Sequence, residues 1–175
     1  MVEGAATLIK TQGVTATSLS EVLVESGAPR GSIYHHFPQG KRQLVGDAVR
    51  WTSERVLSHQ GSCPSRSPEE VLGWFVAMWR QVVVASSGAA GCVVAGVAVD
   101  SPGSSELIDV VRDTFRSWVD LVTAQLESAG LTAERASSVA TTALAAMEGA
   151  LILCRAERDV RPLDVVAEQL GRLLD

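Results

Sequence analysis

The residues best able to recognise a ligand by hydrogen bonds and charge lie in one short run, PRGSIYHHFPQGK, between Pro29 and Lys41. Arg30 can make the bidentate contact to guanine that is the commonest specific contact to a DNA base. Tyr34 and His35 can hydrogen-bond to a phosphate or a base edge, and Lys41 can bind the DNA backbone. Taken singly, Tyr34 could pack with only its tip polar, and a lone exposed arginine is usually solvated. Only the residues together indicate recognition of a duplex.

The backbone around this run suits close approach to a phosphate. Gly31 and Ser32 lack bulk, so the chain there can come near a groove. A helix expected from about Pro29 would present unpaired amides and the positive end of its dipole. Thr17 and Ser18, at the start of the preceding helix, could bind phosphate on the other side of the groove. The alternative for these two is simple helix capping, since both residue types begin helices in any protein.

Two neighbouring histidines, His35 and His36, raise the question of a metal site, because histidine is the commonest metal ligand. Adjacent residues of a helix do not share a face, so the two rings should diverge. No further ligand stands at a suitable spacing, and His59 is isolated. We therefore expect no metal site and no cofactor, and we expect His36 to cap or pack rather than to touch DNA.

Composition limits the class of protein. The chain has 175 residues, 46% hydrophobic and 20% charged, which is typical of a globular protein of one ordinary domain or of a small module fused to a larger one. Its formal net charge of -5 excludes a protein that coats nucleic acid by charge alone. Residues 1–50 carry a balance of +1 and the rest a balance of -6, which suggests two different roles.

Three further features indicate a cytoplasmic protein. Cys63, Cys92 and Cys154 have no metal-ligand spacing and read as thiols in a reducing compartment. The beginning of the sequence has no export-signal pattern. Residues 81–99 are uncharged, but they contain glycine and serine and no Leu, Ile or Phe, so we expect no membrane span.

Helical periodicity predicts an all-α fold. We expect a first helix ending near Gly13, a second starting with a capping box of Ser18 and Glu21 and ending at Gly27, and a third over about 29–36. The second and third would form a helix-turn-helix. Further helices are expected over about 41–59, 68–86, 104–129, 132–157 and 162–174, with a short helical turn around 92–99. Ile33 and Phe37 should face the core.

The segment TSLSEVLVESGAPRGSIYHHFPQGKRQLVGDAV resembles the DNA-binding domain of the TetR family of one-component transcriptional regulators, most closely in GSIYHHFPQGK. The resemblance covers about residues 5–50. It implies a three-helix DNA-binding domain over residues 1–46 and a helical ligand-binding and dimerisation domain over residues 47–175. Family members usually carry a basic arm ahead of the point where Met1 stands, so either the start lies upstream or that arm is missing. Residues to which the resemblance gives DNA-contact roles are Thr17, Ser18, Arg30, Gly31, Ser32, Tyr34, His35 and Lys41.

The resemblance also implies roles for the second part of the chain. A cavity for a small effector would lie between the middle helices, and the alternative for each of its residues is ordinary core packing. The last two helices would pair with their copies in a homodimer, placing two recognition helices about one turn of DNA apart, roughly 34–36 Å. The predicted ligand-binding residues are Trp74, Met78, Phe115, Trp118, Met147 and Glu148. The predicted interface residues are Ala143, Ala146, Ala150, Val166, Leu170 and Leu173.

The sequence therefore predicts a DNA-binding transcriptional regulator, a repressor released from double-stranded operator DNA by a small apolar or aromatic effector. Two alternatives stand beside it. One is a helical enzyme that uses the apolar cavity, against which the sequence shows no nucleophile arrangement, phosphate-binding loop or carboxylate pair in a readable motif. The other is a protein–protein adaptor with a vestigial helix-turn-helix.

Overall fold

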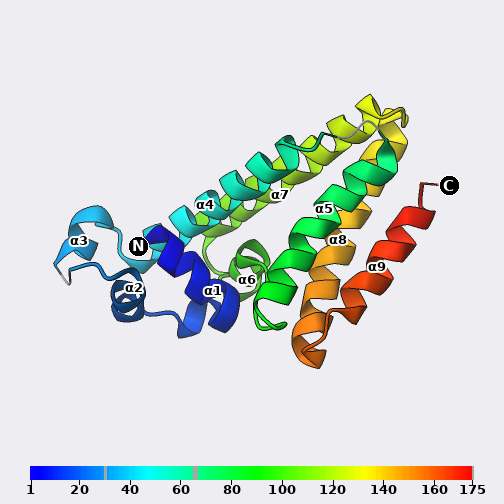
Figure 1. Cartoon of the computed structure of the whole chain (residues 1–175). Helices are drawn as coiled ribbons and strands as arrows, with labels where there is room; N and C mark the ends of the chain where they lie inside the picture. The colour runs from blue at the N-terminus through cyan, green and yellow to red at the C-terminus, as the bar shows by residue number, and fades with distance from the viewer. Residues whose placement is uncertain (30, 65–66, 175) are drawn as a thin grey trace. The chain divides into compact units, whose positions relative to one another are not determined.

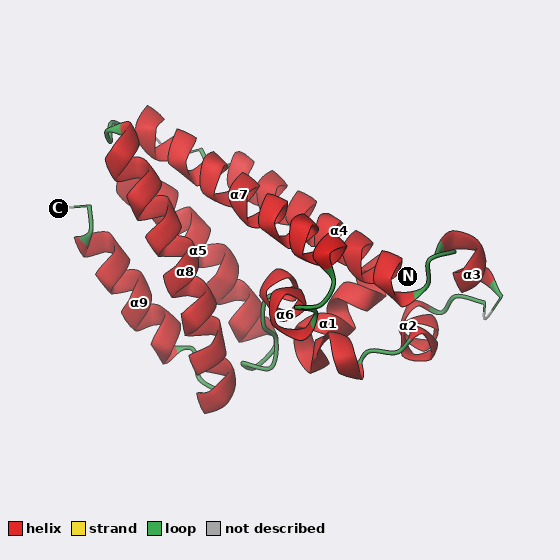
Figure 2. Ribbon diagram, turned by 180° about the vertical axis from the view of Figure 1, so that it is seen from behind, coloured by secondary structure: helices red, strands yellow, loops and turns green. Residues whose placement is uncertain are grey.

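The computed structural model describes residues 1–29, 31–64 and 67–174, and the regular structure in those residues is all helical (Figures 1 and 2). The predicted all-α fold is confirmed. In chain order the helices are α1 (Val2–Ala16), α2 (Leu19–Ser26), α3 (Ser32–His36), α4 (Lys41–Gly61), α5 (Pro68–Ala85), α6 (Val93–Asp100), α7 (Ser105–Ser128), α8 (Ala133–Glu157) and α9 (Arg161–Arg172).

The helices form two compact units that a single cut in the chain does not separate. The first unit comprises Met1–Arg55 together with Cys92–Phe115, and the second comprises Val56–Gly91 together with Arg116–Asp175. Helix α6 therefore belongs to the same unit as α1, α2 and α3, although it lies far along the sequence. This membership matters for the functional site, because a helix from the middle of the chain helps to hold the N-terminal helices.

The first unit is built on a small apolar core. Ile9 of α1, Val22 of α2 and Ile33 of α3 are each no more than 2% exposed, and Phe37 closes the core after α3. Val97 of α6 is fully buried. The inward positions expected for Ile33 and Phe37 are confirmed. Burial of these side chains removes apolar surface from water, which is what keeps short helices such as α2 and α3 folded.

The second unit contains α5, α8 and α9, which lie side by side in both ribbon views (Figures 1 and 2). Its core contains Phe75 and Trp79 of α5, Trp118 of α7 and Met147 of α8, none more than 4% exposed. An exposed ion pair between Arg80 and Asp164, 2.8 Å apart, joins α5 to α9. Because that pair is solvated, apolar packing supplies most of the stability.

The uncharged stretch 81–99 does not form one helix. Helix α5 ends at Ala85 and α6 begins only at Val93, with turns and a loop between them. In the described residues, the helix long and apolar enough to cross a membrane is instead α8, whose most apolar window has a mean hydropathy of 1.5 and is 44% buried. Length and composition alone give this result, and the core helix of a soluble protein gives it equally.

Candidate nucleic-acid interface

The start of α2 has the capping box that the sequence predicts. The Ser18 hydroxyl oxygen accepts a hydrogen bond from the amide of Glu21 at 3.2 Å, and the amide of Ser18 donates to Oε2 of Glu21 at 2.7 Å. The two side chains thereby satisfy amides that a helix start would otherwise leave unpaired. Ser18 is exposed and retains its hydroxyl proton as a donor, so capping and a phosphate contact are compatible.

Thr17 differs from the prediction. Its side chain is only 3% exposed, and its hydroxyl donates to the carbonyl of Gly13 at 2.8 Å. A buried hydroxyl already committed inside the protein is not available to a phosphate, so we do not retain Thr17 as a direct contact. The sequence could not distinguish the two neighbours, because both suit a helix start equally well.

Helix α3 is shorter than predicted. It begins at Ser32 rather than near Pro29, and both the amide and the hydroxyl of Ser32 donate to the carbonyl of Pro29, at 3.0 and 2.7 Å. Gly31 is exposed at the N-cap, and Arg30 lies outside the described residues. A helix of five residues has a weak dipole, so recognition must rest on its side chains more than on its N-terminus.

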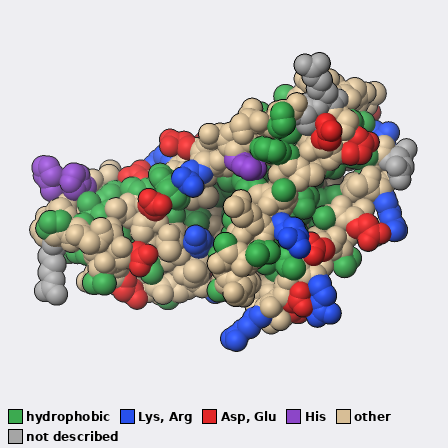
Figure 3. All heavy atoms as spheres, viewed as in Figure 1, with side chains coloured by type: hydrophobic (Ala, Val, Ile, Leu, Met, Phe, Trp, Pro, Cys, Tyr) green, Lys and Arg blue, Asp and Glu red, His purple; other side chains and the backbone are tan. Residues whose placement is uncertain are grey.

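The exposed side chains of α3 are polar and aromatic. Tyr34 is 71% exposed, which excludes core packing as its main role. His35 is exposed, and so is His36. The exposure of His36 argues against packing, one of the two roles, capping or packing, expected for it. The two imidazole rings meet edge to face with their centroids 5.3 Å apart, and they form a protruding group in Figure 3. His36 is thus a candidate contact that the sequence interpretation missed.

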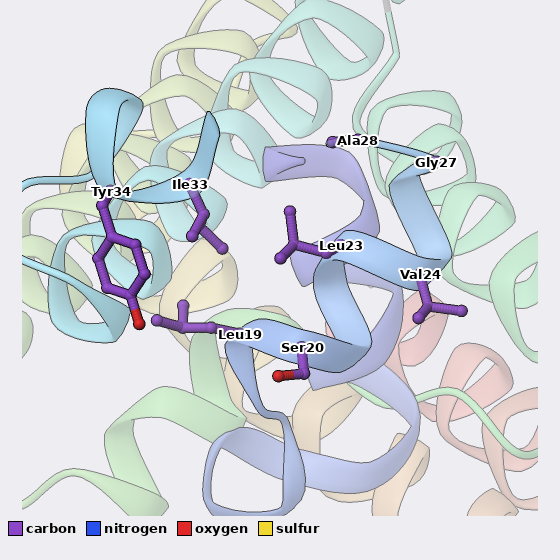
Figure 4. Close-up of a pocket in the computed structure, with 8 residues that line it drawn as sticks. All are labelled: Leu19, Ser20, Leu23, Val24, Gly27, Ala28, Ile33 and Tyr34. Atoms are coloured by element: carbon purple, nitrogen blue, oxygen red, sulfur yellow. The ribbon is translucent and has the colours of Figure 1, made fainter. Parts of the chain in front are cut away.

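A groove of about 640 Å³ runs between the two helices of the motif (Figure 4). Tyr34 and Leu19 extend toward each other across one end of it, and Ile33 and Leu23 face each other deeper in. The Tyr34 side chain, whose hydroxyl is directed toward Leu19, therefore has an apolar neighbour at this end of the groove. Residues lining the groove are Leu19, Ser20, Leu23, Val24, Gly27, Ala28, Ile33 and Tyr34.

Lys41 stands at the first turn of α4, and its ammonium donates to the carbonyl of Thr15 at 3.4 Å. The ammonium carries three protons, so this bond leaves donors for a phosphate. Lys41 thus ties α4 to the segment between α1 and α2 while keeping its charge at the surface. In the described residues, no group of three or more His, Cys, Asp or Glu side chains is arranged to hold a metal ion.

Two family profiles match the chain. Residues 1–48 match the bacterial regulatory proteins of the tetR family, and residues 68–169 match the C-terminal domain of LmrA/YxaF-like transcriptional regulators. The chain belongs to the TetR family of transcriptional regulators. It is consequently a DNA-binding protein of the helix-turn-helix class, as the resemblance implied. The family is one of transcriptional regulators.

Individual relatives agree with this assignment over the full length. An HTH-type transcriptional regulator of Mycobacterium tuberculosis is 36% identical, covering 99% of this chain and 92% of its own. The HTH-type transcriptional regulator LmrA of Bacillus subtilis is 28% identical, with coverages of 99% and 94%. A TetR-family regulator from Agrobacterium tumefaciens of known crystal structure has a TM-score of 0.83 at 26% identity, with coverages of 99% and 94%.

The predicted ligand-binding residues of this TetR-family regulator divide by burial. Trp118 and Met147 are 1% and 0% exposed, whereas Trp74, Met78 and Glu148 are half-buried, as is Phe115, the last residue of the first unit. Trp74 donates its indole N–H to the carbonyl of His59 at 2.9 Å and stacks on the His59 ring at 5.0 Å. Trp74 therefore secures the end of α4 in this structure.

Trp79, like Phe75, is a buried aromatic residue that the site prediction omitted. Its ring lies 5.9 Å from that of Trp118 and 6.2 Å from that of Phe75. Its indole nitrogen is buried without a hydrogen-bond partner among the described residues. The four-residue spacing of Phe75 and Trp79 was the available signal, since residues so spaced share a helix face.

The predicted interface residues of the regulator also differ in burial. Ala143, Ala150 and Leu170 are at most 3% exposed inside one protomer, so their side chains are not available to a second copy. Ala146 and Val166 are half-buried, and Leu173 is 44% exposed. The apolar side chains that do face outward on the last two helices are Ile152 and Leu153 of α8 and Val165 of α9, with exposures of 70%, 50% and 59%.

The stability of the helix-turn-helix should depend on pH through the capping box of Ser18 and Glu21. Hydrogen bonds from the Ser18 side chain and backbone lower the pKa of Glu21 from its ordinary value of 4.5. The stabilisation by ionised Glu21 is therefore complete above that ordinary value and is lost as the pH falls through the lowered pKa of the folded state. Urea unfolding should show Glu21→Gln less stable than wild type at pH 7, with the gap closing in acid.

Glu127, exposed near the end of α7, provides the matched control. Glu127→Gln should leave stability nearly unchanged at both pH values. A pH-independent gap for Glu21→Gln would contradict the role given to its carboxylate.

Proposed function

We propose that this regulator is a repressor that binds a palindromic operator as a homodimer and is released by a small apolar or aromatic effector. The observation that carries the proposal is the polar, exposed surface of α3 beside the capped start of α2. Tyr34, His35 and His36 project from a motif whose family binds DNA. With the overall charge of the chain negative, attraction to DNA must be local to this surface.

Contacts on this surface fall into two kinds. Ser18 and Lys41 offer hydrogen-bond donors suited to phosphate, which fixes the register of a protein on the duplex. Gly31, Ser32, Tyr34 and His35 lie on or beside α3, the element that would enter the major groove, and His36 joins them. Arg30 remains a predicted base contact on sequence grounds alone.

Effector binding is supported by the character of the second unit. Trp79 and Trp118 lie against each other in a core that also contains Met147, and apolar and aromatic side chains of this kind line small-molecule sites. The unpartnered indole N–H of Trp79 would favour an effector that carries a hydrogen-bond acceptor, because an unsatisfied buried donor is costly. Met78 and Glu148 are half-buried and adjoin Trp79 and Met147 in the sequence, so they remain part of the proposed site.

Dimerisation is supported by exposed apolar side chains of α8, of α9 and of Leu173, which follows α9. Ile152, Leu153, Val165 and Leu173 present apolar surface to water, and pairing with a second copy would bury it. In the proposal these residues, with Ala146 and Val166, replace the buried Ala143, Ala150 and Leu170.

The test uses a palindromic duplex selected by the wild-type protein from a random pool. We expect binding whose logarithm falls steeply with the logarithm of salt concentration, and a sedimenting species of twice 18.5 kDa. Tyr34→Ala should weaken binding by about 10-fold to 100-fold, as expected for loss of a hydrogen bond to a charged group. Gln81→Ala, an exposed change on α5, should leave the affinity unchanged.

Tyr34→Phe separates the two roles of the tyrosine, since it removes only the hydroxyl. If the protein selects no duplex even at low salt, the proposed operator binding is wrong. If a monomer binds the duplex tightly, the proposed dimer is wrong. Repression itself is read from a reporter behind the selected duplex, whose transcription should rise when the protein is absent.

A further inference from the structure

Helix α1 is broken one turn before its end. Gly13 adopts φ 85° and ψ 169°, a conformation outside the helical region and essentially restricted to glycine. The chain resumes a helical turn after Gly13 and ends at Ala16. Such a break is costly for a helix, so some other part of the molecule must compensate for it.

The compensating group is the carboxylate of Asp100, the last residue of α6. Its Oδ2 accepts a hydrogen bond from the amide of Val14 at 2.8 Å, across 86 residues of sequence. The same oxygen lies 2.8 Å from where a Cβ on Gly13 would stand, so the carboxylate fills the space that the glycine leaves. An acidic residue at a helix C-terminus is unfavourable for that helix, which points to a tertiary reason for Asp100.

Hydrogen bonds continue from this break to the start of α2. The carbonyl of Gly13 accepts from the hydroxyl of Thr17 at 2.8 Å, which keeps Thr17 buried. On the other side, Lys41 donates to the carbonyl of Thr15. The next residue after Thr17 is Ser18, which caps α2. The segment from Gly13 to Ser18 is thus held by α6 on one side and by α4 on the other.

We propose that Asp100 is a positioning residue for operator binding. By holding the amide of Val14, it fixes the break in α1 and so sets where Ser18 and the start of α2 stand relative to α3. The inference rests on the proposed operator contacts of the helix-turn-helix. It assigns a role in DNA binding to a side chain that does not itself touch DNA.

Charge alone predicts the opposite effect, which makes the proposal testable. Removing an acidic side chain makes the protein less negative and should strengthen binding to DNA slightly. Loss of the Asp100 hydrogen bond should instead weaken it. We expect Asp100→Ala to raise the Kd for the selected duplex by roughly tenfold or more, the loss typical of a hydrogen bond to a charged group.

Two variants complete the experiment. Asp100→Asn removes the charge but keeps a carbonyl oxygen that can accept from Val14, so its affinity should return to within about threefold of wild type. Asp109→Ala removes an exposed acid from α7 in the same unit, where it pairs with Arg112 at 2.6 Å, and should bind at least as tightly as wild type. The rescue by asparagine is not expected of a residue that acts only through charge.

Amide hydrogen exchange without DNA provides a second readout. The amides of Val14 and Glu21 should exchange faster in Asp100→Ala than in wild type and recover in Asp100→Asn. If Asp100→Ala leaves both exchange rates unchanged, or binds the duplex as tightly as Asp109→Ala, the positioning role is wrong. If the wild type selects no duplex, operator binding fails, while the exchange rates still decide whether Asp100 holds the segment.

Discussion

Replacing Trp118 by alanine is expected to lower the free energy of unfolding by about 3–5 kcal/mol, the range typical of a large aromatic side chain removed from a core. Trp118 is 1% exposed and lies against Trp79 from α5, so its removal leaves a cavity between two helices of the second unit. Urea unfolding followed by circular dichroism measures the difference. Trp118→Phe keeps most of the apolar contact and should cost much less.

Trp51 is the matched control for this change. It is half-buried, and its ring partner is the guanidinium of Arg55, 4.8 Å from the ring centroid. Such exposed cation–π contacts are worth about 0.5–1 kcal/mol, so Trp51→Ala should be mild. Equal losses for the two tryptophans would show that Trp118 is not a core residue. A stable Trp118→Phe variant would then allow the effector contact proposed for this position to be measured separately.

Replacing Gly88 by alanine should cost about 2–4 kcal/mol, combining a left-handed backbone with overpacking. Gly88 has φ 78°, and a Cβ there would lie 3.1 Å from the carbonyl oxygen of Cys154 and 3.1 Å from Cα of Arg158. Both are backbone atoms at the end of α8, so neither can move aside as a flexible side chain could. Thermal unfolding, with the enthalpy measured by calorimetry, gives the loss.

Gly27 separates the two contributions to that loss. It has φ 63°, and a Cβ there would meet no atom within 4 Å. Gly27→Ala should therefore show only the backbone cost, about 1–2 kcal/mol. If Gly27→Ala and Gly88→Ala are equally destabilised, the close approach of the loop after α5 to the end of α8 contributes nothing.

Local features of the helix-turn-helix were predictable from the sequence because they depend on neighbours three or four residues apart. Ser18 and Glu21 have the spacing at which each side chain reaches the other's amide, and Gly27 has the freedom that a helix end requires. The same reasoning placed α3 too early, because Pro29 suits a turn as well as a first helical turn. The exposure of His36 could not be predicted from the sequence, because five helical residues are too few to show which face is buried.

The sequence by itself determined the fold class, the helix-turn-helix and the family, since these follow from periodicity and from a run of closely spaced residues. Only the tertiary structure decided that Thr17 is buried while Ser18 is exposed, and that Ala143 and Leu170 pack within the protomer. An apolar stripe specifies that a helix face is buried, but not against which partner. The pairing of Asp100 with Val14 is of the same kind, because residues far apart in the chain meet only through the packing of the helices that carry them.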